Sequence, residues 1–121
     1  MALGGTRVLV VEDEPMLSLA LQDMLADLGC VVAGTAARLA PALRLARELD
    51  FDVAVLDINL GGERVDPVAE AVAARRLPVV FLTGYGRDGA PSHVPGLVVE
   101  KPYQPDILEQ ALGRAMGMRD A

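Results

Sequence analysis

Short aliphatic runs alternate with other segments along almost the whole chain, and this alternation most limits what the chain can fold into. Five runs of this kind cover residues 7–11, 31–33, 53–56, 79–82 and 97–99. Runs with apolar residues on both faces are typical of strands buried inside a parallel sheet. Strands that alternate with helices predict such a sheet with helices packed on both sides.

Four of the intervening segments repeat apolar residues at helical spacing. They cover residues 15–28, 39–49, 66–76 and 105–116. The length of 121 residues suits one domain, which we expect to span residues 1–121. The sequence therefore predicts an α/β, flavodoxin-like, doubly wound, five-stranded parallel sheet of strand order 2-1-3-4-5.

The segment from residue 84 to residue 96 breaks the pattern. It holds Gly84, Gly86, Gly89 and Gly96 together with two prolines, and few apolar residues at helical spacing. Glycine and proline both disfavour helix, by about 1 and about 3 kcal/mol per site. A flavodoxin-like fold has its fourth helix at this place, between the fourth and fifth strands. Here we expect that helix to be irregular or mobile.

The composition limits the partners. Lys and Arg number 11 against 17 Asp and Glu, for a net charge of −6. An acidic chain lacks the basic surface that nucleic acids and anionic membranes require, so neither is an expected partner. The single cysteine, Cys30, rules out an internal disulfide and fits a reducing compartment. No apolar run approaches the length of a membrane span. We expect a cytoplasmic protein.

Polar residues stand where each of four expected strands ends. Glu12 and Asp13 follow the first, Asp57 the third, Thr83 the fourth, and Lys101 comes soon after the fifth. Because the carboxyl ends of parallel strands share one edge, these side chains should meet there. Crowded carboxylates without His or Cys favour a hard cation such as Mg²⁺. The whole set suits phosphoryl transfer, which depends on positioning and charge neutralisation.

Four ordered motifs resemble the receiver domains of bacterial two-component response regulators. They are Val-Val-Glu-Asp-Glu-Pro at 10–15, Val-Leu-Asp-Ile-Asn-Leu at 55–60, Phe-Leu-Thr-Gly at 81–84 and Val-Val-Glu-Lys-Pro-Tyr at 98–103. The resemblance implies that Asp57 accepts a phosphoryl group from a sensor histidine kinase. It also implies that Thr83 and Lys101 contact that group, and that the bond between Lys101 and Pro102 is cis.

The same resemblance implies a Mg²⁺ site. Asp13, Asp57 and the backbone carbonyl of Asn59 would hold the ion, and Glu12 would assist through water. The protein would then be no enzyme in the ordinary sense, because it would catalyse only its own phosphorylation and dephosphorylation. Its output would be contact with, or phosphoryl transfer to, a downstream regulator or phosphotransfer protein. We expect a stand-alone receiver that is a monomer or weak dimer.

The sequence departs from the common receiver pattern in three places. Asn59 leads into Leu-Gly-Gly where a proline-containing turn is usual, and Val98 stands at the position of an aromatic switch residue. Residues 78–85 resemble the Pro-Phe-x-Phe-Ala-Thr-Gly-Tyr motif of the receiver subfamily nicknamed FATGUY, with Val79 and Leu82 as departures. Tyr85 of this motif either fills the core or caps the phosphoryl site.

Three alternatives remain open from the sequence. A phosphatase or mutase could form an aspartyl-phosphate intermediate, although its usual nucleophile follows the first strand and not the third. A nucleotide or flavin module is disfavoured by the acidic residues 12–14, which repel phosphate. A degenerate receiver that acts only as a binding module is disfavoured by the complete set of Asp13, Asp57, Thr83 and Lys101.

Overall fold

The computed structural model describes residues 3–84, 89–101 and 103–119. A five-stranded parallel sheet lies at the centre of the molecule, in the order β2-β1-β3-β6-β7. Numbered among themselves, these strands follow the order 2-1-3-4-5, so the predicted flavodoxin-like sheet is confirmed. Its strands are β1 (Arg7–Val11), β2 (Val31–Ala36), β3 (Val53–Asp57), β6 (Val79–Thr83) and β7 (Leu97–Glu100).

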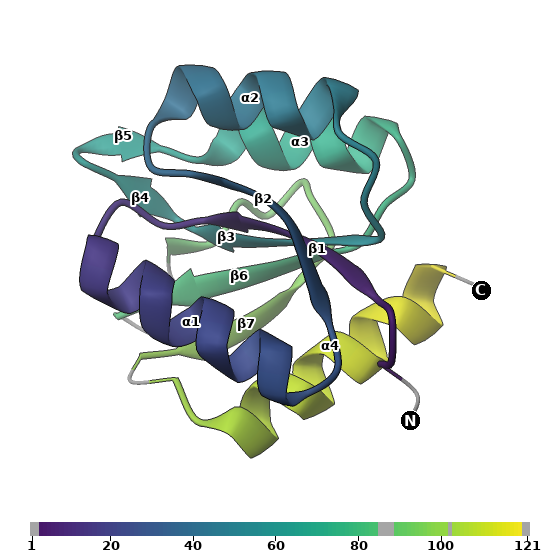
Figure 1. Cartoon of the computed structure of the whole chain (residues 1–121). Coiled ribbons are helices and arrows are strands. Elements are labelled where there is room, and N and C mark those ends of the chain that lie inside the picture. Colours follow the sequence, from purple (N-terminus) through teal and green to yellow (C-terminus); the bar gives the residue numbers. More distant parts are fainter. Residues whose placement is uncertain (1–2, 85–88, 102, 120–121) are drawn as a thin grey trace.

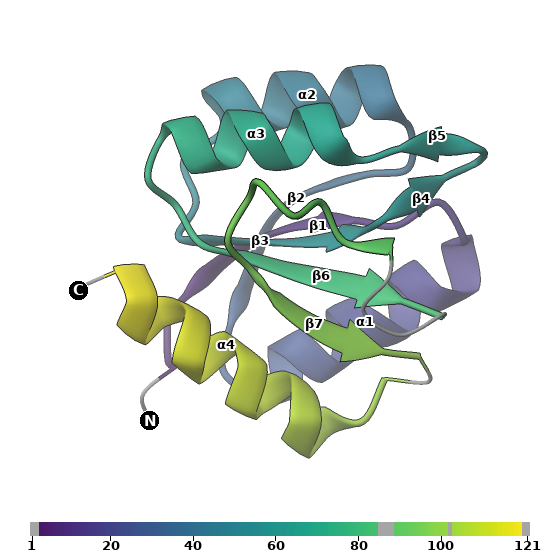
Figure 2. The ribbon, with the colours of Figure 1, turned by 180° about the vertical axis from the view of Figure 1, so that it is seen from behind.

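Helices cover both faces of this sheet, as Figures 1 and 2 show. On one face lie α1 (Pro15–Asp27) and α4 (Pro105–Arg119). On the other face lie α2 (Leu39–Glu48) and α3 (Asp66–Ala74). The four helices and the sheet form the three layers that the alternating pattern predicted.

Each central strand feeds two hydrophobic cores. In β1, Val8 and Val10 belong to the core beneath α1 and α4, whereas Leu9 and Val11 belong to the core beneath α2 and α3. Every residue of β3 and β6 is buried. This two-faced burial follows from the alternation of side chains along a strand, and it explains why the strands are apolar without interruption.

Several boundaries differ from the prediction. Strand β2 continues to Ala36, three residues beyond the expected run, because its backbone stays paired with β1. Helix α3 ends at Ala74, and Arg76 takes a φ of +60° that lies outside helical geometry. Pro41 is accommodated in the first turn of α2, where a missing N–H costs no helical bond.

A short antiparallel hairpin follows β3, and the sequence analysis did not predict it. Strand β4 (Asn59–Leu60) pairs with β5 (Glu63–Arg64). Gly61 and Gly62 connect them with φ values of +59° and +94°. A two-residue turn with positive φ at both positions strongly favours glycine. The Gly-Gly pair was therefore a readable signal for this hairpin.

The described residues between β6 and β7, namely 84 and 89–96, contain no α-helix. They nevertheless help to fill the core on the α2 and α3 face, where Val94 is buried in the same cluster as Phe81. For these residues, the expected departure from a regular fourth helix is confirmed.

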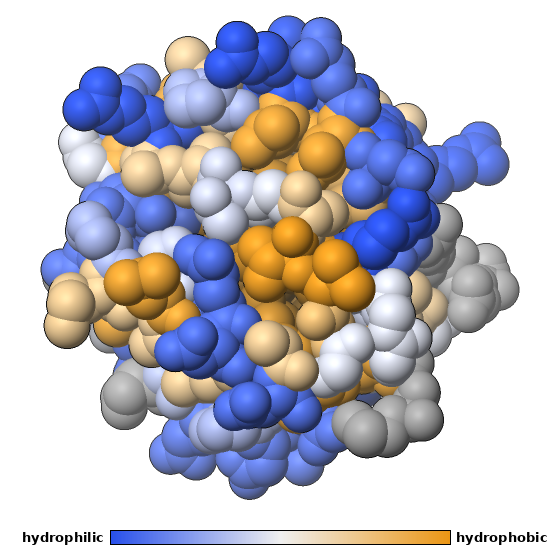
Figure 3. All heavy atoms as spheres, viewed as in Figure 1, coloured by the Kyte–Doolittle hydropathy of each residue, from blue (hydrophilic) through white to orange (hydrophobic). Residues whose placement is uncertain are grey.

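The outer edge of the sheet at β2 is partly exposed, and Val31 is 51% exposed. Figure 3 shows apolar residues gathered near the middle of this side of the molecule, with hydrophilic residues around them. No helix within the described part of the chain combines the length and apolar character that crossing a membrane requires.

Gly96 lies so close to Phe81 and Val79 that a larger residue there should lower the stability of the protein. A Cβ atom there would lie 2.6 Å from Phe81 Cε2 and 3.0 Å from the carbonyl oxygen of Val79. We expect Gly96→Ala to lower the free energy of unfolding by about 1–3 kcal/mol. Gly113→Ala in α4 meets no atom within 4 Å, so it should raise stability by about 0.5–1 kcal/mol. Urea denaturation measures both, and equal effects would contradict this packing.

Candidate functional site

The carboxyl edge of the sheet gathers the five residues expected there. Glu12 and Asp13 follow β1, Asp57 ends β3, Thr83 ends β6 and Lys101 follows β7. Carboxylate oxygens of Glu12, Asp13 and Asp57 all lie within 4.8 Å of one another. The parallel register places these ends side by side, with Asp57 opposite Leu82 and Thr83 opposite Glu100.

Asp57 is buried, and both of its carboxylate oxygens accept hydrogen bonds. Lys101 Nζ donates to Asp57 Oδ2 over 3.1 Å, and the backbone N–H of Asn59 donates to Asp57 Oδ1 over 3.2 Å. The backbone N–H of Lys101 also donates to the carbonyl of Thr83 at 2.8 Å. This bond anchors the Lys101 backbone to the end of β6. These contacts hold the carboxylate in one orientation.

Glu12 lies deeper, with its side chain fully buried. Its Oε2 accepts a hydrogen bond from the Tyr103 hydroxyl at 2.9 Å and lies 3.7 Å from Lys101 Nζ. Burial, reinforced by the negative charge of Asp57, raises the pKa of Glu12 to about 7. A carboxyl group with this pKa changes its charge near neutral pH.

The two neighbours of Glu12 also have displaced pKa values. Burial lowers the pKa of Lys101, but its hydrogen bond to Asp57 and the surrounding carboxylates outweigh that effect and raise it above the usual value. Burial, together with the charge of Glu12, raises the pKa of Tyr103. Lys101 therefore stays a cation and Tyr103 a neutral donor at neutral pH.

Asp13 and Asn59 tie the β4–β5 hairpin to the site. The backbone N–H of Gly61 donates to Asp13 Oδ2 at 2.9 Å, and the backbone N–H of Gly62 donates to Asn59 Oδ1 at 2.8 Å. Asn59 thus acts as a turn residue through its side chain, while its backbone carbonyl is the group expected to bind a metal. That metal-binding role remains a prediction.

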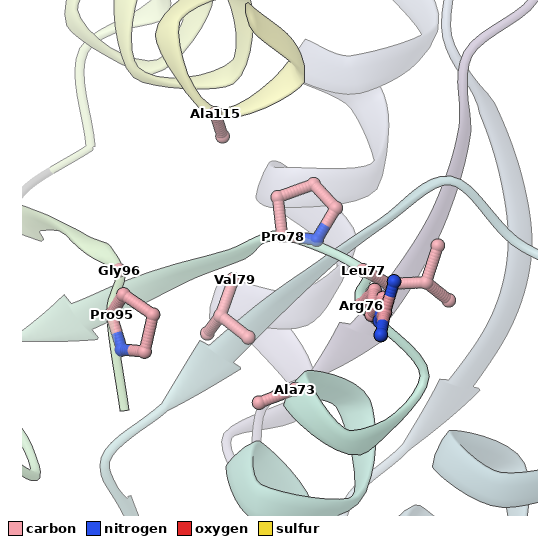
Figure 4. Close-up of a pocket in the computed structure, with 8 residues that line it drawn as sticks. All are labelled: Ala73, Arg76, Leu77, Pro78, Val79, Pro95, Gly96 and Ala115. Carbon is pink, nitrogen blue, oxygen red and sulfur yellow. The ribbon is translucent and has the colours of Figure 1, made fainter. Parts of the chain in front are cut away.

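A hollow of about 640 Å³ lies over this edge of the sheet, and its wall includes Asp13, Asp57, Asn59, Arg64, Thr83, Gly89 and Lys101. A second hollow, of about 180 Å³, lies at the other end of β6, between α3, α4 and the start of β7 (Figure 4). Its lining is mostly apolar: Ala73, Arg76, Leu77, Pro78, Val79, Pro95, Gly96 and Ala115. Of these two hollows, the first combines carboxylates, a hydroxyl and an ammonium group in its wall.

Of the remaining predicted residues, the structure describes Val98, which stands apart from this cluster. Val98 lies on β7 opposite Phe81 and packs on the core beneath α2 and α3. Because it is a valine, it supplies no aromatic switch ring. Tyr85 and Pro102, with the predicted cis bond before Pro102, lie outside the described residues.

The sequence analysis missed Tyr103, Arg64 and Gly89. Tyr103 was readable in principle, because a buried Glu12 needs a donor and a tyrosine hydroxyl supplies one. Arg64 depends on the hairpin, since its place in the wall follows from the turn at 61–62. Nothing local to Gly89 marks it, because its contacts come from residues far away in the chain.

The donor set fits a magnesium ion. All of its side-chain ligands are carboxylate oxygens, which hard cations prefer, and Mg²⁺ commonly takes one or two carboxylates and keeps several waters. A divalent ion would also relieve the repulsion among three acidic groups.

The fold and site together define a parallel α/β domain with an acidic carboxyl edge. The chain matches the response regulator receiver domain family over residues 8–112, and it belongs to that family. Proteins of this family are signalling components of two-component systems and not classical enzymes. They generally bind Mg²⁺, and they interact with histidine kinases or downstream partners.

Three relatives illustrate the similarity. The chain is 28% identical to the phyllosphere-induced regulator PhyR of Methylorubrum extorquens, over 93% of this chain and 44% of PhyR. It is 29% identical to the transcriptional regulatory protein PdtaR of Mycobacterium tuberculosis, over 67% of this chain and 40% of PdtaR. The solution structure of SdrG from Sphingomonas melonis superposes with a TM-score of 0.80 at 38% identity, covering 100% of this chain and 99% of SdrG. The chain spans less than half the length of the two curated relatives.

The raised pKa of Glu12 predicts a pH dependence of stability in the metal-free protein. At pH values between the ordinary pKa of a glutamate and about 7, Glu12 binds a proton in the folded state but not in the unfolded state. The free energy of unfolding of wild type therefore falls as the pH rises through this range. Relative to Glu12→Gln, wild type should lose about 2 kcal/mol of unfolding free energy between pH 5.5 and pH 8. Urea denaturation in EDTA measures this difference, and parallel pH profiles for the two proteins would contradict it.

Proposed function

We propose that this chain is a phosphoacceptor in a two-component phosphorelay, with Asp57 receiving a phosphoryl group from a sensor histidine kinase in a Mg²⁺-dependent reaction in the cytoplasm. The observation that supports it most is the position of Asp57 Oδ2, 3.1 Å from Lys101 Nζ and within a cluster of three carboxylates. This is a nucleophile next to a fixed positive charge.

In this reaction a carboxylate oxygen of Asp57 attacks the phosphorus atom, and the bond from phosphorus to the donor nitrogen breaks. Lys101, which lies 3.1 Å from Asp57 Oδ2 and 3.7 Å from Glu12 Oε2, would also offset the charge of the new phosphoryl group. Thr83, at the same wall of the hollow, would donate its hydroxyl to a phosphoryl oxygen. Asp13, Asp57 and the carbonyl of Asn59 would hold Mg²⁺, with Glu12 assisting through water, and the ion would supply charge neutralisation when bound.

We further propose that residues 1–121 form one receiver domain of the FATGUY subfamily. The described residues 84 and 89–96, which lack an α-helix, and the Phe81, Thr83 and Gly84 positions of its motif support this assignment. The output would be contact with, or phosphoryl transfer to, a downstream regulator or phosphotransfer protein, in keeping with the partners that receiver domains have generally.

Phosphorylation by a small donor tests the proposal. After incubation with acetyl phosphate and Mg²⁺, intact-mass measurement should show one added phosphoryl group on wild type and none on Asp57→Asn. Asp23→Asn, on the exposed face of α1, is the matched control and should be labelled like wild type. No labelling of wild type, or equal labelling of Asp57→Asn, would contradict the proposal.

The same experiment separates the competing functions. An unlabelled wild type would favour a module that only binds partners. Continuous release of inorganic phosphate from simple phosphate esters would favour an enzyme that forms an aspartyl-phosphate intermediate. The proposed receiver should instead take up one phosphoryl group and return slowly to the free carboxylate.

A further inference from the structure

Arg64 connects three segments at the wall of the hollow. Its Nη2 donates to the carbonyl oxygen of Gly89 at 2.6 Å, and its Nε donates to Asp66 Oδ1 at 3.0 Å. Arg64 itself lies on β5, Asp66 begins α3, and Gly89 belongs to the segment after β6. One guanidinium group therefore joins the hairpin, a helix and the stretch that stands in place of a regular fourth helix.

The backbone at Gly89 lies directly against the phosphoacceptor site. A Cβ atom at this position would be 3.4 Å from two side-chain carbons of Ile58 and 3.9 Å from Thr83 Oγ1. Ile58 is the residue next to Asp57, and Thr83 carries the hydroxyl of the site. Gly89 thus covers the flank of the hollow beside both residues.

Contacts that begin at the Asp57 carboxylate hold Arg64 in position. Arg64 pairs with Asn59 across the hairpin, and the backbone N–H of Asn59 donates to Asp57 Oδ1. A continuous set of contacts therefore runs from the Asp57 carboxylate through the hairpin to Arg64, and from Arg64 to the backbone of Gly89.

We propose that Arg64 is a positioning residue that sets the lifetime of the phosphorylated form, by holding the Gly89 backbone over Ile58 and Thr83. This inference rests on the proposed function of Asp57. Loss of the phosphoryl group requires water: its oxygen bonds to phosphorus, its protons stay with the phosphate released, and the Asp57 carboxylate leaves. A wall held closed at Gly89 restricts the approach of that water.

The geometry calls for arginine in particular. The guanidinium plane presents N–H groups in two directions at once, so it reaches the Asp66 carboxylate and the Gly89 carbonyl together. A lysine ammonium carries the same charge on a flexible stem without this fork. Arg64→Lys therefore separates the effect of positioning from the effect of charge.

The test compares Arg64→Ala and Arg64→Lys with wild type and with Arg44→Ala. Arg44 lies on the exposed face of α2, away from the hollow, and is the matched control. Each protein is phosphorylated with acetyl phosphate and Mg²⁺, freed of the donor, and followed by intact mass over time. The amide signal of Gly89 is recorded by NMR in the unphosphorylated proteins, and urea denaturation reports stability.

Both Arg64 variants should accept the phosphoryl group and lose it about two- to thirtyfold faster than wild type, the range that mutations within a coupled network produce. The Gly89 amide signal should shift in both. Since the Arg64 side chain is 55% exposed, the urea midpoint should stay at the wild-type value, which separates positioning from a general loss of structure. Arg44→Ala should match wild type throughout.

A wild-type lifetime in Arg64→Ala would overturn this inference and leave the proposed function intact. A wild-type lifetime in Arg64→Lys would show that charge alone matters, and would also overturn it. Absence of any phosphorylation on wild type would overturn both proposals together.

Discussion

The contact between Lys101 Nζ and Asp57 Oδ2, at 3.1 Å, offsets the repulsion within a cluster of three carboxylates. Three carboxylates lie within 4.8 Å of one another, and one of them, Glu12, is fully buried. Such a group is costly unless a cation and hydrogen bonds compensate for it. Lys101 supplies the positive charge and Tyr103 supplies a hydroxyl donor. The fold thus brings beside the acids two groups that offset part of the cost of burying them.

The fold concentrates this chemistry at one edge. Strands β3 and β6 are buried along their full length, so polar residues have a place only where the strands end. The hollow at the other end of β6 has a mostly apolar lining (Figure 4). The β4–β5 hairpin then adds a second layer, since its backbone contacts Asp13 and its Arg64 reaches Gly89. The hairpin thus contacts both the site and the segment after β6.

Sequence patterns sufficed for the sheet and for the main acidic cluster, because both follow from local rules. Uninterrupted apolar runs indicated buried parallel strands, and their ends indicated where Glu12, Asp57 and Lys101 would meet. The hairpin was missed although its Gly-Gly turn was readable. Arg64 and Gly89 are 25 residues apart, and no local pattern connects them. The structure brings the acidic residues and Lys101 together, but the functional roles of all the site residues stay predictions. Tyr85 and Pro102 lie outside the described residues, and Val98 has no aromatic ring to act as a switch.

The most direct test of the central claim measures how magnesium affects stability. If the three carboxylates form one cation site, Mg²⁺ binds the folded state and raises the free energy of unfolding in proportion to the logarithm of its concentration once the site is near saturation. The account predicts this rise in wild type and in the exposed-surface variant Asp23→Asn, and its loss in Asp13→Asn. The same response to Mg²⁺ in all three proteins would contradict it.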